Sequence, residues 1–120
     1  MRRLRLTIPW PPSANNIWRN AGRITYLSPL YKRFLSAVFA EVPSQVRNWK
    51  AFAGPVRVSI VWNPPTRRAF DIDNKLKPTL DALTRLGVWL DDAQVIELRV
   101  TKGPIIKGGQ ASIEIEEVNE

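Results

Sequence analysis

Cysteine and histidine are both absent from this 120-residue sequence. Zinc sites built from Cys and His, cysteine nucleophiles, Ser–His pairs and histidine-metal nuclease sites are therefore excluded. Acidic residues are also scarce, because 11 Asp and Glu stand against 18 Lys and Arg, for a net charge of +7. Acid–base or metal chemistry must come from Asp, Glu, Lys, Tyr or bound water, so the positions of the few acids matter most.

Long apolar runs are missing too. No run approaches the ~20 residues of a membrane span, and residues 1–7 lack the apolar stretch of about 7–15 residues that marks a secretory signal. We therefore expect a cytoplasmic protein without a membrane partner. Of the 18 basic residues, 12 are Arg, the side chain best suited to bidentate phosphate contacts. The charge favours a nucleic-acid partner.

Alternation of apolar and polar residues predicts strands at 4–10, 56–62, 96–100 and 111–115. The last two flank a Gly-rich and Lys-containing segment, 102–109, and are interpreted as a hairpin. Residues 70–73 alternate in the same way and are expected to be extended, as are residues 24–26. Residues 11–16 are expected to form a loop.

Two helices are predicted. Ser28 and Pro29 are typical of a helix start, and the helix would end near Pro43. Its expected apolar stripe is Leu30, Phe34, Leu35, Val38 and Phe39. A second helix is expected over roughly 75–86, with Pro78 in its first turn and Gly87 closing it. We therefore expect one α+β domain over residues 1–120, with a small mixed sheet packed against two main helices.

Asp71 and Asp73 form the first acidic cluster. On a strand, residues two apart point to the same face, so the two carboxylates would project side by side and repel unless they share a cation. Mg²⁺ commonly binds one or two carboxylates together with water and substrate phosphate. Alternatively, Asp73 or Asn74 only caps the following helix.

Asp91 and Asp92 form a second acidic cluster between the helix and the next strand. A strand–helix–strand arrangement would bring this cluster near Asp71 and Asp73. Lys77, four residues after Asp73, would lie one helical turn on and lean toward the carboxylates. The simpler alternatives are a solvated turn for the Asp pair and an ion pair between Lys77 and Asp81.

The order of these motifs closely resembles the RusA family of Holliday-junction resolvases. The matching segments are Arg67 to Asn74 (RRAFDIDN), Lys77, Asp81-Ala82-Leu83, and Trp89 to Val95 (WLDDAQV). The segments Trp10 to Asn16 and Lys102 to Gly109 resemble the family's opening segment and late loop. Some members carry Arg before the first Asp, where this chain has Phe70, and an apolar residue after Asp-Asn, where it has Lys75.

The resemblance implies a homodimeric, Mg²⁺-dependent, structure-specific endonuclease that resolves four-way junctions by paired symmetrical nicks in DNA recombination and repair. Mn²⁺ could substitute for Mg²⁺, and a prophage origin fits. By the same resemblance, the catalytic carboxylates and metal ligands are Asp71, Asp73 and Asp92, with Asp91 as a further candidate ligand. Lys77 matches the family's functional lysine.

Contacts to DNA would be made mostly to its backbone. The candidate residues are Arg19, Arg23, Arg67, Arg68, Lys75, Lys102 and Lys107, with Arg2, Arg3 and Arg5 also available. Two other functions fit the basic charge: a non-catalytic DNA- or RNA-binding module, and a metal phosphodiesterase that acts on other branched nucleic acids. A third alternative function is that of a small structural or assembly protein that serves only to form a dimer.

Overall fold

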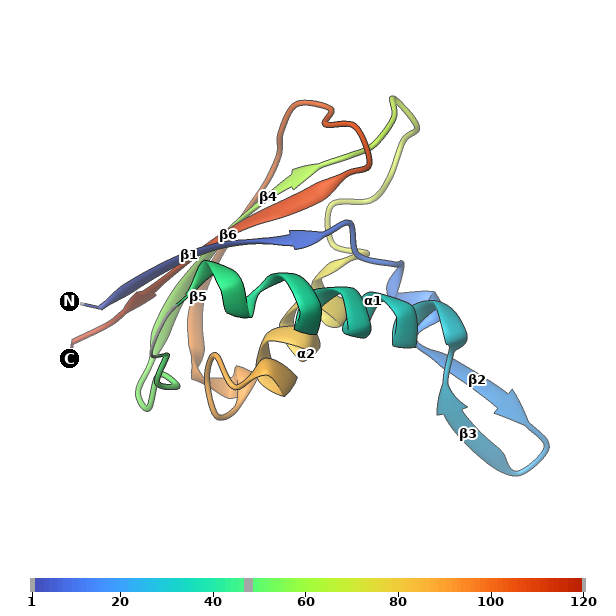
Figure 1. Cartoon of the computed structure of the whole chain (residues 1–120), viewed down its shortest axis with the longest axis horizontal. Helices are drawn as coiled ribbons and strands as arrows, with labels where there is room; N and C mark the ends of the chain where they lie inside the picture. Colours follow the sequence, from blue (N-terminus) through green and yellow to red (C-terminus); the bar gives the residue numbers. More distant parts are fainter. Residues whose placement is uncertain (1, 47–48, 120) are drawn as a thin grey trace.

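A four-stranded sheet carries two main helices on one face, and a separate two-stranded hairpin extends from one end (Figure 1). The computed structural model describes residues 2–46 and 49–119. The predicted α+β class, with a mixed sheet and two helices in one small domain, is confirmed. None of the helices in these residues is long and apolar enough to cross a membrane.

The sheet contains β1 (Arg3–Pro9), β6 (Gln110–Glu117), β4 (Val56–Asn63) and β5 (Val95–Lys102), in that spatial order. Strand β6 runs antiparallel to both neighbours, and β5 runs parallel to β4. The predicted hairpin between the last two strands is therefore wrong. Every second residue of β6 is buried whereas β5 is mostly exposed, so β6 takes the central position and β5 the edge.

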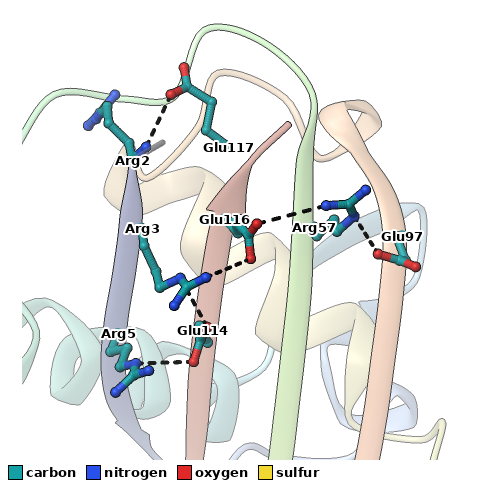
Figure 2. Close-up of polar contacts among 8 residues, drawn as sticks. All are labelled: Arg2, Arg3, Arg5, Arg57, Glu97, Glu114, Glu116 and Glu117. Atoms are coloured by element: carbon teal, nitrogen blue, oxygen red, sulfur yellow. Dashed lines mark hydrogen bonds and ion pairs between the residues drawn. The ribbon is translucent and has the colours of Figure 1, made fainter. Parts of the chain in front are cut away.

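The inward face of the sheet forms the core. Apolar residues alternate with exposed ones along β1 and β4, as predicted, and the inward ones are buried. The outward face is polar, and Figure 2 shows Arg and Glu side chains that pair across neighbouring strands. This clean division between the two faces explains why periodicity located these strands correctly.

Helix α1 (Pro29–Glu41) begins where the Ser-Pro pair predicts, because the Ser28 side chain accepts a hydrogen bond from the Tyr31 backbone N–H. The predicted apolar stripe is correct only in its centre. Leu30 and Phe39 are 41% and 44% exposed, while Tyr31 is fully buried. The helix rests on the sheet along a narrower strip than the apolar pattern suggests.

Helix α2 (Leu76–Leu86) matches its prediction closely, with Pro78 in the first turn. Gly87 has φ 80° and ends the helix in the left-handed conformation that glycine adopts without strain. The Tyr31 hydroxyl of α1 donates a hydrogen bond to Asp81 of α2, and Arg85 donates to the same carboxylate at 2.8 Å. Burial and the Asp81 carboxylate together raise the pKa of Tyr31 well above its ordinary value.

The projecting hairpin pairs β2 (Trp18–Ala21) with β3 (Ile24–Leu27). The predicted extended segment at 24–26 is confirmed, but the partner strand was not expected from the sequence. Nearly all hairpin side chains are exposed, including Trp18 at 54% and Ile24 at 66%. The hairpin therefore extends from the domain as an arm (Figure 1).

Candidate active site

Three loops gather at one end of the sheet because β1, β4 and β5 all run in the same direction. These loops are residues 10–17, 64–75 and 103–109. The Ala14 N–H donates to the Asn74 carbonyl at 2.7 Å, and the Ile106 N–H donates to the Pro64 carbonyl at 3.0 Å. The rings of Trp10 and Phe70 meet edge to face, with centroids 5.2 Å apart. We call this region the loop end.

Asp71 and Asp73 lie at the loop end in a turn that leads into α2, so the predicted strand at 70–73 is wrong. The Asn74 N–H donates to the Asp71 carbonyl, and the Trp62 indole N–H donates to the Ile72 carbonyl at 2.8 Å. These bonds satisfy the backbone without a sheet neighbour. Ile72 is 43% exposed, and both aspartates are exposed at the surface of the same turn.

Lys77 is exposed on the first turn of α2, four residues after Asp73. Lys75 is only 9% exposed. Its ammonium group donates to the Pro11 carbonyl at 2.7 Å and lies 4.6 Å from the centre of the Trp10 ring. Burial lowers the pKa of Lys75. Lys75 therefore ties the first loop to the start of α2 and is not available as a DNA contact.

Two of the alternative roles suggested for single residues are not found. Helix α2 has no side-chain cap, so neither Asp73 nor Asn74 acts as one. The carboxylate of Asp81 binds Tyr31 and Arg85, and no ion pair joins it to Lys77 in the described part of the chain.

Most of the remaining basic candidates lie on exposed loops. Arg67, Arg68 and Lys107 are exposed at the loop end, and Arg19 and Arg23 are exposed on the hairpin. Lys102 donates to the Phe70 carbonyl and lies 4.4 Å from the centre of the Phe70 ring. Lys102 therefore fixes the segment that immediately precedes Asp71.

The three N-terminal arginines are already engaged within the chain. Arg3 and Arg5 pair with Glu114 and Glu116 at 3.1–3.3 Å (Figure 2). Arg2 lies 4.7 Å from the centre of the Trp49 ring. These arginines are therefore engaged with other side chains of the same chain, whereas the loop and hairpin candidates named above are exposed.

Asp91 and Asp92 lie at the opposite end of the sheet. The Asp91 side chain accepts a hydrogen bond from the Ala93 N–H at 2.8 Å and caps the short 3-10 helix η3 (Asp92–Gln94). Gln94 completes a capping box, because its side chain accepts from the Asp91 N–H at 2.9 Å. This arrangement occupies Asp91, whereas Asp92, the first residue of η3, is partly exposed.

Within one chain, Asp92 does not join Asp71 and Asp73. Helix α2 carries the chain back along the sheet, so η3 lies beside the start of β4 while the 71–75 turn follows its end. A strand as long as β4 spans about 23 Å. Among residues 2–46 and 49–119, no three Asp or Glu side chains lie close enough to hold a metal ion. The expected approach of the two acidic clusters is therefore wrong for a single copy.

The chain as a whole matches known endonucleases. Residues 9–116 match the family model described as Endodeoxyribonuclease RusA. The chain belongs to the RusA family. A crossover junction endodeoxyribonuclease of Enterobacteria phage 82 is 40% identical over 119 residues, which cover 98% of each chain. RusA proteins of Shigella sonnei and Escherichia coli K12 are 40% identical over 114 residues, covering 94% of this chain and 93% of theirs. The family predicted from the sequence is confirmed, and it is a family of endodeoxyribonucleases.

The structure also explains the role of Gln94, which follows the two aspartates in the RusA-like segment Trp89 to Val95. The Gln94 side chain accepts from the Leu90 N–H and donates to the carbonyls of Phe52 and Gly54, each at 2.8 Å. Gln94 thus holds the segment that contains Asp92 against the residues that immediately precede β4. The capping-box spacing from Asp91 to Gln94 was visible in the sequence and could have identified this role.

Proposed function

We propose that this chain is a Mg²⁺-dependent crossover junction endodeoxyribonuclease, which resolves four-way DNA junctions by paired symmetrical nicks in recombination and repair. Relatives that carry this name align over almost the full chain at 40% identity. The observation that carries the proposal is the loop end itself. It exposes Asp71 and Asp73 in a turn that is flanked in sequence by the exposed Arg67, Arg68 and Lys77. In this proposal the turn would bind the metal ion and the flanking cations would bind phosphate.

The active enzyme is a homodimer in this proposal, because one copy does not assemble the metal site. Asp71 and Asp73 supply two hard oxygen donors, which suit Mg²⁺ or Mn²⁺. The third carboxylate, Asp92, lies about a strand's length away in the same chain. A twofold-related copy would bring its own Asp92 to the turn, and symmetry would then produce two identical sites. Two such sites account for paired nicks on opposed strands.

Each side chain at this site has a separate task. Asp71, Asp73 and the partner's Asp92 would hold the cation, which when bound polarises the phosphate and makes a water molecule more acidic. Lys77 would donate hydrogen bonds to the phosphate oxygens as negative charge develops. The Lys102 contact with the Phe70 carbonyl keeps the segment before Asp71 in place.

DNA binding would rest on charge and shape. Arg67, Arg68 and Lys107 would contact phosphates near the cleaved bond, and Arg19 and Arg23 on the hairpin would reach a neighbouring arm of the junction. Contacts to the backbone position the protein without reading the sequence. Their displacement of counterions makes binding fall steeply with salt.

The test is the Asp71→Asn variant on a synthetic four-way junction with mapped products. We expect cleavage in Mg²⁺ to fall at least about 1,000-fold, a loss on the scale of a major electrostatic contribution. Junction binding should persist or tighten, since one repulsive charge is removed. The matched control is Glu41→Gln, an exposed carboxylate at the end of α1. Retained cleavage by Asp71→Asn, or equal cutting of linear duplex and junction, would refute the proposal.

A further inference from the structure

A cavity of about 480 Å³ lies at the loop end, between the loop that follows β1 and the loop that follows β4. Its walls include Trp10 and Asn16 from the first loop, and Pro65, Arg68 and Phe70 from the second. Binding sites for small organic groups commonly measure about 300–1,000 Å³. The proposed metal ligands do not line this cavity, so its contents are a separate question.

The two aromatic rings of the cavity are held in place by other side chains. Trp10 and Phe70 meet edge to face, with centroids 5.2 Å apart. The Lys75 ammonium group lies 4.6 Å from the centre of Trp10, and that of Lys102 lies 4.4 Å from the centre of Phe70. A wall that is already fixed loses little conformational freedom when a flat ligand packs against it.

Asn16 gives the cavity a hydrogen-bonding group that the protein itself does not use. The Asn16 backbone is engaged, because its N–H donates to the Ser13 carbonyl at 2.9 Å and its carbonyl accepts from the Ser28 hydroxyl. Its side-chain amide makes no hydrogen bond within residues 2–46 and 49–119. An asparagine amide carries donors and an acceptor, and it can form two hydrogen bonds with the edge of a nucleobase.

Arg68 adds positive charge to the same wall. Its side chain is exposed, and it forms no ion pair in the part of the chain that the structure describes. A free guanidinium group suits a phosphate, which it can bind through two parallel hydrogen bonds. Fixed aromatic rings, a free amide and a guanidinium group together match the parts of a nucleotide.

We propose that this cavity binds one nucleobase of the DNA substrate, taken out of its stack beside the bond that is cut. This inference rests on the proposed function, because it names a subsite of the same active site. Phe70 directly precedes Asp71, and the Ala14 N–H ties the first loop to the Asn74 carbonyl at 2.7 Å. A base in the cavity would therefore belong to a nucleotide next to the scissile phosphate.

Stacking and hydrogen bonding would have different effects on specificity. The aromatic rings accept every base, because each base has a π face. The Asn16 amide would distinguish the bases, since each presents its own set of donors and acceptors. Taking a base out of its stack costs least where the base is not fully paired. The cavity would therefore favour branched DNA over linear duplex and prefer certain bases at one position.

Photo-cross-linking tests the occupant of the cavity directly. Asp71→Asn protein is bound to four-way junctions that carry one 5-iodouracil, which is moved one nucleotide at a time past the mapped cleavage site. Irradiation couples iodouracil preferentially to aromatic rings that it touches. We expect one label position to give a cross-linked peptide that contains Trp10 or Phe70. Cross-links only to the hairpin residues Trp18 and Tyr26, or none at any position, would overturn the proposal.

Cleavage rates test the role of Asn16. Wild-type protein should cut junctions that differ only in the base at that position at rates that differ about tenfold, the scale of one base-specific pair of hydrogen bonds. Asn16→Ala, shown to be folded by circular dichroism, should cut all of them at similar rates. The matched control is Asn119→Ala, an exposed asparagine beyond the end of β6, which should keep the wild-type differences. Unchanged differences in Asn16→Ala would show that the cavity does not read the base.

These outcomes are separate from those that test the proposed function. If Asp71→Asn loses cleavage while Asn16→Ala keeps the full base preference, the metal site stands and the assignment of the cavity fails. If Asp71→Asn still cleaves DNA while the label couples to Trp10, the cavity binds a base and the proposed catalytic role of Asp71 fails.

Discussion

The two edges of the sheet are built in opposite ways. At the β1 edge, the side-chain amide of Gln45 accepts from the Thr7 N–H at 2.7 Å and donates to the Thr7 carbonyl at 2.8 Å. The inward residues Leu4, Leu6 and Ile8 are at most 7% exposed. A side chain therefore takes the place of a neighbouring strand, and the core covers the apolar residues.

The β5 edge has none of this protection. Leu98 is 38% exposed although it lies beside the buried Val58 of β4, and no side chain among the described residues is hydrogen-bonded along the outer side of β5. Natural sheets usually block exposed edges against unwanted pairing. The sheet of one copy therefore blocks its β1 edge and leaves its β5 edge open.

The largest difference between the edges should appear in core truncations. Leu6→Ala removes a buried side chain from β1 and should lower the free energy of unfolding by about 3 kcal/mol. Leu98→Ala on β5 should lower it by about 1 kcal/mol or less, since that residue is partly exposed in one copy. Urea unfolding at concentrations where both variants are monomeric measures the difference. Equal losses would mean that the two edges do not differ in burial.

The next largest loss of stability should come from removing the hydrogen bond between Tyr31 of α1 and Asp81 of α2. Tyr31→Phe removes the hydrogen bond to Asp81 and should lower the free energy of unfolding by about 1.5 kcal/mol. Thermal or urea unfolding at pH 7 measures this loss. Arg85→Gln, which keeps the Tyr31 contact, is the matched variant and should cost less.

The same tyrosine gives a pH test. The pKa of Tyr31 is raised in the folded protein, so above about pH 10 the unfolded chain loses this proton while the folded chain keeps it. The contribution of Tyr31 is therefore complete below pH 10 and falls as the pH rises beyond it. The wild-type protein should lose stability more steeply above pH 10 than Tyr31→Phe. Parallel curves would show that Tyr31 ionises normally.

A smaller effect is expected at the protected edge. Gln45→Ala removes two hydrogen bonds to the Thr7 backbone and should lower stability by about 1 kcal/mol. It also opens the β1 edge, so light scattering should detect more self-association than in the wild-type protein. If the variant associates no further than the wild type, Gln45 is not what keeps the β1 edge closed.

The smallest effect on folding should come from the open edge. Glu97 is exposed, and its ion pair with Arg57 at 2.7 Å is worth less than about 1 kcal/mol. Glu97→Gln should therefore leave monomer stability nearly unchanged. Urea unfolding measures this change, and a loss of more than about 1 kcal/mol would contradict so small a contribution.

Local sequence patterns predicted the elements of this fold better than their arrangement. The strands at β1 and β4 and both helices follow from apolar periodicity, Ser28, Pro78 and Gly87. The hairpin between β5 and β6 was wrong because short sequence separation favours pairing, whereas the buried pattern of β6 requires neighbours on both sides. Periodicity also misread residues 70–73, where Trp62 and the turn itself satisfy the backbone.

The candidate site shows the same contrast between local features, which the sequence predicts, and their arrangement in space, which it does not. Residue types and spacing selected Asp71, Asp73, Lys77 and the Asp91–Asp92 pair, and the family resemblance singled out Asp92. The family is confirmed. The sequence could not show that α2 returns the chain to the opposite end of the sheet and separates Asp92 from the pair. The burial of Lys75 was equally hidden, since it depends on a contact with Pro11, 64 residues away in sequence.

The central claim is that each metal site takes carboxylates from two copies of the chain. It is tested most directly by mixing Asp71→Asn protein with Asp92→Asn protein, after subunit exchange has been verified. Each variant alone should be inactive on a four-way junction. A mixed dimer would hold one site with both aspartates intact, so the mixture should regain nicking at one of the two strands. A mixture that contains mixed dimers yet stays as inactive as its parents would show that each site is built from a single chain.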